Sequence, residues 1–526
     1  MKVLVSDSIS EKGIKILKKI PEMKVVVHTK HTPEELGKLV EDCDALIVRS
    51  ATKVTKDIIE KAKKLKVVGR AGSGLDNIDA TAATKKGIVV MNTPGGNTIT
   101  TAEHAISLLF ALARKTPQAN TSMKNGKWEK GKFVGTELNN KTLGVIGVGR
   151  IGSAVAERAK GLKMHVIAFD PFVTSEMASM MDVELVSFEK LLAESHFITL
   201  HTPLTNETRG LLNKAAFAKM QTGVMIINCA RGGIIDEDDL LEAIKAKKVA
   251  GVALDVFEKE PPAAKPLYEM DEVILTPHLG ASTEEAQENV AIAIVEQIVN
   301  YLTKGEIQNA TNVPSVSKEV LEKLQPYLSI AEKIGSFQAQ IDVGGLKEIT
   351  IEYSGEVTRF DLTPITISFL KGLLSPTLTE NINFVNAPVV AKERGIKVVE
   401  TKISTSENFT NLLTLKTKTS KGEQIISGTL FNNQEQRIVR INQFRVEVIP
   451  EGEMLIVHTH DRPGVIGSIG TILGHHNINI ARMQFSREKQ EDKALVVLNN
   501  DSPISEEVMK TLSSLQNILS VKKVVL

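Results

Sequence analysis

Three polar side chains, Arg231, Glu260 and His278, each follow an apolar segment that predicts a β-strand. If the strands are parallel, such side chains converge where the carboxyl ends of the strands meet the ligand crevice. A histidine can take a hydroxyl proton near neutral pH, and a carboxylate can hold its tautomer and raise its pKa. An arginine can bind a carboxylate through two hydrogen bonds. Each residue alone is more often structural, but together they predict oxidation of a hydroxy acid.

A glycine motif, Gly147-Val148-Gly149-Arg150-Ile151-Gly152, joins a predicted strand to a predicted helix. The first glycine, Gly147, suits a tight turn, and Gly149 lets the backbone approach a pyrophosphate. Gly152 lets the helix pack against the strand, and the helix N-terminus offers N–H groups to an anion. The motif predicts a dinucleotide site, with a purely structural glycine turn as the alternative.

Asp170 ends the next predicted strand and lies 18 residues after Gly152. This is close to the spacing of about 20 residues expected for the acid that binds the adenosine ribose. Its carboxylate would accept bonds from the ribose hydroxyls and repel a 2′-phosphate. Residues 171–174 contain no Arg or Lys, so the sequence favours NAD over NADP.

The elements that position these residues alternate between strand and helix patterns, which is typical of parallel sheets and predicts the α/β class. The first series has strands at residues 2–5, 24–28, 45–48 and 67–69, followed by a helix over 101–113. The second has strands at 142–146, 165–169, 197–200, 224–228, 252–254 and 273–275, followed by a helix over 283–304. Both series predict doubly wound sheets.

The C-terminal part has a different pattern. A helix over 318–338 precedes strands at 348–353, 397–401, 412–417, 424–431 and 438–449, which predicts an α+β domain. Residues 452–526 predict the order βαββαβ of the ferredoxin-like fold. We therefore expect four domains: 1–98 with 283–307, 99–282, 308–450 and 451–526.

The composition excludes several classes. Among 526 residues, 64 Lys and Arg balance 63 Asp and Glu, so no basic surface for nucleic acid or anionic membranes is expected. No apolar run reaches the length of a membrane span, and the N-terminus lacks the pattern of a signal peptide. Only Cys43 and Cys229 are present, which suits a reducing compartment, so a cytoplasmic protein is predicted. No metal site is predicted, because His475-His476 lacks further ligands at suitable spacing.

Four segments, at residues 69–79, 144–152, 228–233 and 277–283, resemble the signatures of the D-isomer-specific 2-hydroxyacid dehydrogenases. The resemblance covers about residues 1–307. It implies a flavodoxin-like substrate domain and a Rossmann NAD domain, with His278 as the catalytic base, Glu260 as its partner and Arg231 as the substrate anchor. The NAD contacts that the motif and the resemblance imply come from Gly147, Gly149, Arg150, Ile151, Gly152, Asp170, Thr202, Cys229, Ala230, Arg231, Asp255, His278, Leu279, Gly280 and Ala281. Asp255 would meet the nicotinamide carboxamide, and Cys229 is expected to be a small buried residue with no redox role.

Cations near the predicted substrate site favour a phosphorylated substrate. Arg49 and Arg70 each end a predicted strand, and the resemblance implies that they contact substrate together with Ser73. Lys130 and Lys132 lie in a loop that in this family helps complete the site of a neighbouring subunit, which implies a homodimer or homotetramer. For each cation alone, a solvated surface charge is the alternative. The implied reaction is oxidation of 3-phospho-D-glycerate to 3-phosphooxypyruvate with NAD, the first step of L-serine biosynthesis.

The C-terminal segments 458–465 and 474–480 are similar to those of an ACT domain, a module that binds amino acids. Asp461 could hold an ammonium group and Asn479 offers both a donor and an acceptor, with L-serine as the candidate effector. Capping of a helix by Asp461 and a turn at Asn479 are the alternatives. Residues 310–450 resemble the intervening domain of long members of the family. There, Arg437, Arg440 and Arg445 are candidates for an anionic regulatory site.

Two other functions remain open at this point. One is a broader D-2-hydroxyacid dehydrogenase that acts on hydroxypyruvate, glyoxylate or 2-oxoglutarate. The other is an NAD-sensing scaffold protein that keeps this fold without catalysis.

Overall fold

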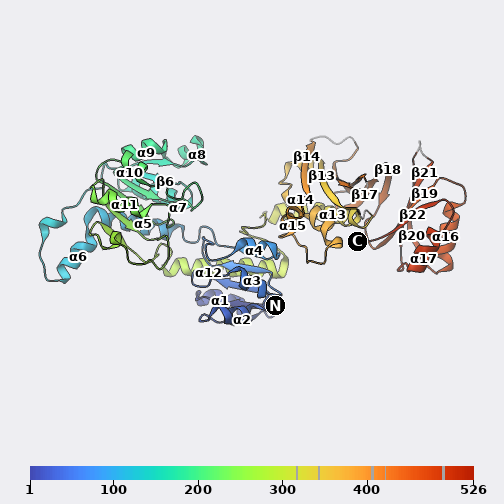
Figure 1. Cartoon of the computed structure of the whole chain (residues 1–526), viewed down its shortest axis with the longest axis horizontal. Coiled ribbons are helices and arrows are strands. Elements are labelled where there is room, and N and C mark those ends of the chain that lie inside the picture. Colours follow the sequence, from blue (N-terminus) through green and yellow to red (C-terminus); the bar gives the residue numbers. More distant parts are fainter. Residues whose placement is uncertain (315–317, 342–343, 404–407, 421, 489–491) are drawn as a thin grey trace.

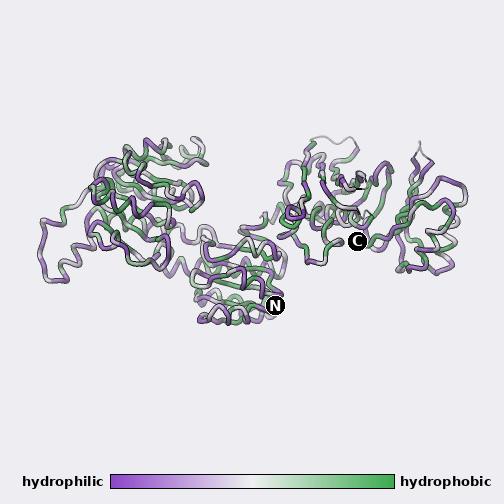
Figure 2. Tube along the Cα trace, viewed as in Figure 1, coloured by the Kyte–Doolittle hydropathy of each residue, from purple (hydrophilic) through white to green (hydrophobic). Residues whose placement is uncertain are grey.

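The computed structural model describes residues 1–314, 318–341, 344–403, 408–420, 422–488 and 492–526, in which the strands form four sheets (Figure 1). Figure 2 shows apolar residues gathered along the strands within each sheet, with many polar residues in the connecting loops. In the described part of the chain, no helix is long and apolar enough to span a bilayer.

The N-terminal sheet has five parallel strands in the flavodoxin-like order β2-β1-β3-β4-β5. The strands are β1 (Lys2–Val5), β2 (Lys24–Val27), β3 (Ala45–Val48), β4 (Val67–Arg70) and β5 (Val89–Met91). The helices are α1 (Glu11–Lys18), α2 (Pro33–Val40), α3 (Lys56–Lys61) and α4 (Ala80–Lys85). The sequence predicts four of these strands. It misses β5, because three buried residues are too short to show a period.

The second sheet has seven parallel strands in the order β12-β11-β10-β9-β6-β7-β8. The strands are β6 (Thr142–Ile146), β7 (His165–Phe169), β8 (Glu184–Leu185), β9 (Phe197–Leu200), β10 (Val224–Asn228), β11 (Val249–Leu254) and β12 (Val273–Leu275). The helices around it are α7 (Arg150–Gly161), α8 (Ser175–Met180), α9 (Phe188–Glu194), α10 (Lys214–Lys219) and α11 (Glu237–Lys245), with the 3₁₀ turn η2 (Pro266–Glu269). The strand order reverses between β6 and β9, which defines the crevice of a dinucleotide-binding sheet. The expected doubly wound fold is confirmed, but six predicted strands become seven. The two residues of β8 add to the edge through pairing with β7 alone.

Two long helices join the first two sheets: α5 (Thr98–Arg114) and α12 (Glu284–Lys304). Leu108 and Leu109 of α5 pack in the core of the seven-stranded sheet. Ile294 and Ile298 of α12 pack in the core of the N-terminal sheet. The chain after α5 forms an arm that consists of α6 (Thr116–Lys124) and the short turn η1 (Lys130–Phe133). This arm extends away from the seven-stranded sheet (Figure 1).

The third sheet has six strands in the order β14-β13-β15-β16-β17-β18 and is antiparallel except for β13 with β14. The strands are β13 (Leu346–Gly355), β14 (Lys397–Ile403), β15 (Asn411–Thr419), β16 (Gly422–Phe431), β17 (Glu435–Ile441) and β18 (Phe444–Val448). The helices are α13 (Lys318–Ile341), α14 (Thr363–Leu374) and α15 (Ala387–Glu393), with the turns η3 (Glu356–Arg359) and η4 (Ser375–Thr377). The single strand predicted over 438–449 is wrong. Asn442 adopts φ 53°, the left-handed conformation of a tight turn, and the chain reverses there into β18.

The C-terminal sheet has the order β20-β21-β19-β22, and its elements follow each other as βαββαβ. They are β19 (Glu453–His460), α16 (Val465–His475), β20 (Ile480–Arg487), β21 (Lys493–Asn500), α17 (Glu506–Ser513) and β22 (Ile518–Val525). This confirms the predicted ferredoxin-like fold. The residue limits of the four domains stay predictions.

Candidate active site

The predicted acid–base pair forms in the structure. His278 follows β12 and Glu260 follows β11, and Nδ1 of His278 lies 2.7 Å from Oε2 of Glu260. The Phe257 N–H donates to Oε1 of Glu260 at 3.2 Å and so orients the carboxylate. Both partners face solvent, with 48% and 38% of their side chains exposed. A substrate can therefore reach the imidazole.

Each member of the His278–Glu260 pair shifts the pKa of the other toward its charged form. The hydrogen bond to Glu260 raises the pKa of His278, against a burial that would lower it. Burial alone would raise the pKa of Glu260, but the hydrogen bond and charge of His278 hold it below its usual range. The imidazole is thus a stronger base than a free histidine, while the carboxylate stays ionised.

The backbone at His278 adopts φ 55°, the left-handed region that side chains with a Cβ rarely occupy. Asp255, which directly follows β11 and is fully buried, holds the residues after this turn. Its carboxylate accepts the N–H groups of Leu279 at 2.7 Å and Gly280 at 2.8 Å, and the Thr276 hydroxyl at 2.6 Å. Asp255 therefore fixes the loop that carries His278.

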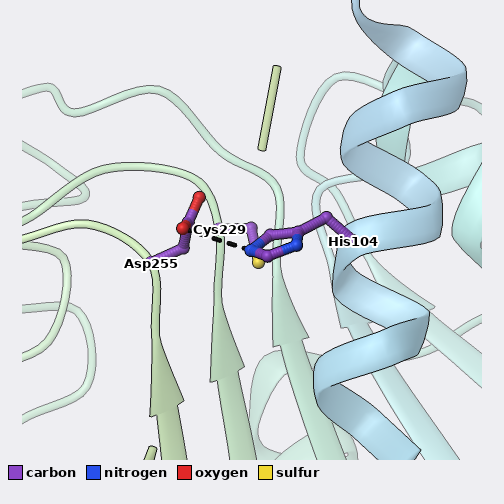
Figure 3. Close-up of side chains that lie close together, drawn as sticks. All are labelled: His104, Cys229 and Asp255. Atoms are coloured by element: carbon purple, nitrogen blue, oxygen red, sulfur yellow. Dashed lines mark ion pairs between the residues drawn. The ribbon is translucent and has the colours of Figure 1, made fainter. Parts of the chain in front are cut away.

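His104, on α5, is a further neighbour of Asp255 that was not predicted from the sequence as a site residue. Its Nε2 atom lies 3.1 Å from Oδ1 of Asp255, and Figure 3 shows the imidazole pointing from the helix toward the strand ends. Burial would raise the pKa of Asp255, but the hydrogen bonds from His104, Thr276 and Leu279 lower it. The one signal in the sequence is a lone histidine in a helix whose second half is mostly apolar.

Cys229 lies beside His104 and Asp255, and their donor atoms fall within 4.8 Å of one another (Figure 3). This grouping does not suit a metal. Metals bind the thiolate, and burial raises the pKa of Cys229 far above its usual range. The acceptor oxygens of Asp255 are already occupied by the loop.

The glycine motif has the geometry of a nucleotide loop. Gly147 has φ 90° at the end of β6, and a Cβ at Gly152 would stand 1.9 Å from the Gly147 carbonyl oxygen. A Cβ at Gly149 would meet no protein atom within 4 Å. There is therefore no room for a side chain at Gly152, where α7 packs against β6. At Gly149 the space is open, and a pyrophosphate could approach the N-terminus of α7 there.

Polar groups suited to NAD face this loop. Both oxygens of Asp170 are oriented by backbone N–H groups, those of Val148 at 3.0 Å and Phe172 at 2.9 Å. The hydroxyl of Thr202 is buried with no partner among the described residues, so it is available to a ligand. Arg150 is the first residue of α7. Ala230 follows β10, and Gly280 lies with Leu279, which is 40% exposed, in the loop after β12. The residues present fit the cofactor, although their individual contacts stay predictions.

Arg231 follows β10, and its positive charge acts to lower the pKa of His278. Its Nε atom lies 3.2 Å from Oδ2 of Asp76, a partner that was not predicted. Arg70 donates to the Gly74 carbonyl, and its Nε donates to the Arg49 carbonyl at 3.3 Å. The charges of Arg49 and Arg231 both act to lower the pKa of Arg70, so the three predicted substrate arginines lie within electrostatic range of one another.

The other predicted substrate residues, Ser73, Lys130 and Lys132, have no hydrogen bond or ion pair with these three arginines among the described residues. The Ser73 hydroxyl donates to Asn97 Oδ1 at 2.7 Å, at the start of α5. Lys130 and Lys132 lie on the arm, where Lys132 pairs with Glu129 at 2.5 Å. No contact among the described residues links these lysines to the site of their own chain.

The predicted effector residues are not brought together within one chain. Asp461 follows the end of β19 and Asn479 precedes the start of β20, and the shared neighbour β21 places them at opposite ends of the sheet. Asp461 pairs with Arg487 at 3.2 Å, and Asn479 donates to Asp501 at 2.5 Å. The first turn of α16 has no side-chain cap, so the capping alternative for Asp461 is wrong. In the intervening domain, Arg437 pairs with Glu435 at 2.8 Å.

Three family models match successive parts of the chain. Residues 106–280 match the D-isomer specific 2-hydroxyacid dehydrogenase, NAD binding domain. Residues 323–442 match the D-3-phosphoglycerate dehydrogenase intervening domain, and residues 454–517 match the ACT domain. Together with the His278–Glu260 pair and the nucleotide loop, they define an NAD-dependent oxidoreductase with a C-terminal ACT domain.

Full-length relatives narrow this class. D-3-phosphoglycerate dehydrogenase of Archaeoglobus fulgidus is 47% identical over 523 residues, covering 99% of both chains. The Bacillus subtilis enzyme of the same name is 44% identical over 522 residues, again covering 99% of both. The chain therefore belongs to the D-3-phosphoglycerate dehydrogenase family. Among solved structures, D-lactate dehydrogenase of Aquifex aeolicus complexed with NAD and lactic acid matches with TM-score 0.52 and 27% identity, covering 60% of this chain and all of that one.

Proposed function

We propose that this chain oxidises 3-phospho-D-glycerate to 3-phosphooxypyruvate with NAD, the first step of L-serine biosynthesis. The observation that carries the proposal is the His278–Glu260 pair, 2.7 Å apart at the open end of the crevice and within the field of Arg231. The full-length relatives support the substrate.

In this reaction, Glu260 holds the proton of His278 on Nδ1, which leaves Nε2 free to accept the substrate hydroxyl proton. Arg231 binds the substrate carboxylate and orients the carbon that bears the hydroxyl. The loop at Gly147, Gly149 and Gly152 and the carboxylate of Asp170 would hold NAD, which would supply the hydride acceptor for that carbon. As the hydride leaves, the hydroxyl proton passes to Nε2 of His278 and the carbon–oxygen double bond forms. The products on the protein are the ketone and a protonated His278.

The substrate phosphate lies near Arg49 and Arg70 in this proposal. Arg70 is already held by backbone carbonyls, so it is preorganised. Lys130 and Lys132 would reach the site of a second copy from the arm. Exposed apolar side chains on the arm support this assembly: Trp128 is 79% and Val134 72% exposed.

The ACT domain is proposed to bind L-serine between two copies of the chain. Its two candidate residues, Asp461 and Asn479, lie at opposite ends of one sheet, so one ligand can meet both only across a side-by-side dimer. We therefore propose a homodimer or homotetramer. We also propose a cytoplasmic location, which the two buried free thiols Cys43 and Cys229 support.

The test is formation of NADH by the purified full-length protein with NAD and 3-phospho-D-glycerate, with and without L-serine. Glyoxylate, hydroxypyruvate and 2-oxoglutarate, assayed with NADH in the reverse direction, test the broader dehydrogenase. No NADH production from 3-phospho-D-glycerate would overturn the proposal, and an unchanged rate at high L-serine would overturn the effector role alone.

A further inference from the structure

A cavity of about 320 Å³ lies in the intervening domain, lined by residues of α13, α14, β13 and β15 and by neighbouring loops. It uses none of the residues assigned above. Pockets that hold small ligands measure about 300–1,000 Å³. The cavity is therefore large enough for a molecule of several heavy atoms.

Two buried polar side chains in its wall have no hydrogen-bond partner among the described residues. Gln338 on α13 is 1% exposed with both Nε2 and Oε1 unpaired, and Thr417 on β15 is 1% exposed with Oγ1 unpaired. Buried polar groups are nearly always paired, because leaving one unpaired costs free energy. Thr414, three residues earlier on β15, follows the rule and pairs with Ser427 at 2.8 Å. By contrast, the polar atoms of Gln338 and Thr417 have no partner among the described residues and are available to a ligand in the cavity.

The remaining lining residues define the chemistry of that ligand. Arg394 is the one charged side chain among the described lining residues, and it is 46% exposed with a long ion pair to Glu380, at 3.9 Å. An exposed pair of this kind is weak, so the guanidinium can bind another anion. The apolar part of the wall comes from Leu346, Leu373, Leu374, Leu378 and Ile396.

We propose that this cavity binds a small monocarboxylic acid with an apolar body and a hydroxyl or carbonyl group. The carboxylate pairs with Arg394, the hydroxyl or carbonyl oxygen bonds to Gln338 and Thr417, and the apolar body contacts the leucines. An inorganic anion lacks the apolar body, so the cavity differs in chemistry from an arginine-lined anion site.

The cavity also lies beside a contact with the ACT domain. Gln340, two residues after Gln338 on α13, exchanges two hydrogen bonds of 2.9 Å with the backbone of Val525 in β22. A ligand that orders this end of α13 would slow hydrogen exchange at the Val525 amide.

The test uses the full-length protein, thermal melting and calorimetric titration. The probes are L-2-hydroxy-4-methylpentanoate, 4-methylpentanoate, which lacks the hydroxyl, and inorganic phosphate, which lacks the apolar body. The variants are Gln338→Leu and Thr417→Val, with Thr414→Val as the matched control. Without ligand, T417V is expected to keep or raise the melting temperature, whereas T414V lowers it by a few degrees, because only T414V breaks an existing bond.

With ligand, the hydroxy acid is expected to raise the melting temperature of the wild type at millimolar concentration, whereas 4-methylpentanoate, which cannot bond to Gln338 and Thr417 through a hydroxyl, is expected not to raise it. Both Q338L and T417V should lose this rise, while T414V keeps it. The proposal is overturned if no probe binds, if phosphate acts as strongly as the hydroxy acid, or if the rise persists in Q338L and T417V, which would mean binding elsewhere. Equal destabilisation by T417V and T414V would assign Thr417 to packing and overturn it as well.

Discussion

The Nε2 atom of His104 lies 3.1 Å from Oδ1 of Asp255. Through this contact, the helix that joins the two sheets of the catalytic part reaches the carboxylate that holds the His278 loop. Asp255 in turn accepts N–H bonds from Leu279 and Gly280. We therefore expect His104 to act as a positioning residue for the His278 loop.

Replacing His104 by Leu should lower kcat/KM about tenfold, since a hydrogen bond to a buried charged group contributes about 1.5–3 kcal/mol. Because His104 helps to lower the pKa of Asp255, its removal should raise that pKa. The limb set by the pKa of His278 should stay in place, but below it the rate of H104L should fall more steeply with decreasing pH than that of the wild type, because Asp255 is then protonated at a higher pH. The control is His165→Leu, which removes an exposed His–Glu184 pair of 3.6 Å in the same sheet. Identical pH profiles for H104L and the wild type would contradict the positioning role.

Replacing Glu260 by Gln should remove the main contribution that raises the pKa of His278. Oxidation needs neutral His278, so its rate rises with pH through that pKa, and this limb should shift to lower pH in E260Q. The loss of the orienting carboxylate should also lower kcat by about 100-fold. Steady-state rates across pH measure both effects, and a limb that stays in place would contradict the assignment.

The His278–Glu260 pair should also make the folding stability depend on pH, with opposite directions for the two residues. The part from His278, whose folded pKa is raised, is present at low pH and is lost as pH rises through that pKa. The part from Glu260, whose folded pKa is lowered, is lost as pH falls through its own value. The difference in melting temperature between wild type and E260Q should therefore be largest between the two folded pKa values.

Two glycines of the nucleotide loop should respond differently to the same added methyl group. In Gly152→Ala the Cβ would collide with the Gly147 carbonyl, so a loss of about 1–3 kcal/mol in the free energy of unfolding is expected. In Gly149→Ala the Cβ meets no protein atom, so the melting temperature should stay unchanged while NAD affinity falls. Melting curves and NAD titrations measure the two effects. Normal NAD affinity in G149A would show that the pyrophosphate does not bind next to Gly149.

Arg49 provides the test of the phosphate site. Its backbone N–H donates to Asp7 at 2.6 Å and its carbonyl accepts from Asn77 at 2.7 Å, and Arg49→Ala keeps both bonds. Loss of one charge-assisted contact should lower kcat/KM for 3-phospho-D-glycerate about tenfold. Activity on D-lactate, which carries no phosphate, serves as the control and should change little. An equal loss on both substrates would place Arg49 outside the phosphate site.

Much of the site could be predicted from the chain because its signals are local. Gly147, Gly149 and Gly152 stand at the spacing that a turn into a helix requires, and each residue of the pair follows a buried strand. A run of apolar residues between turns marks a strand wherever it lies in the fold. The order βαββαβ is likewise visible along the chain.

Only the tertiary structure decided which distant side chains meet. His104 is 151 residues from Asp255 and Asp76 is 155 residues from Arg231, and no periodicity relates such positions. The edge strand β8 exists through pairing with β7, and the separation of β17 from β18 depends on the conformation of Asn442. The sequence by itself determined the chemistry of the residues and the elements that carry them. The tertiary structure decided their partners, because contact depends on how strands and helices pack and not on spacing along the chain.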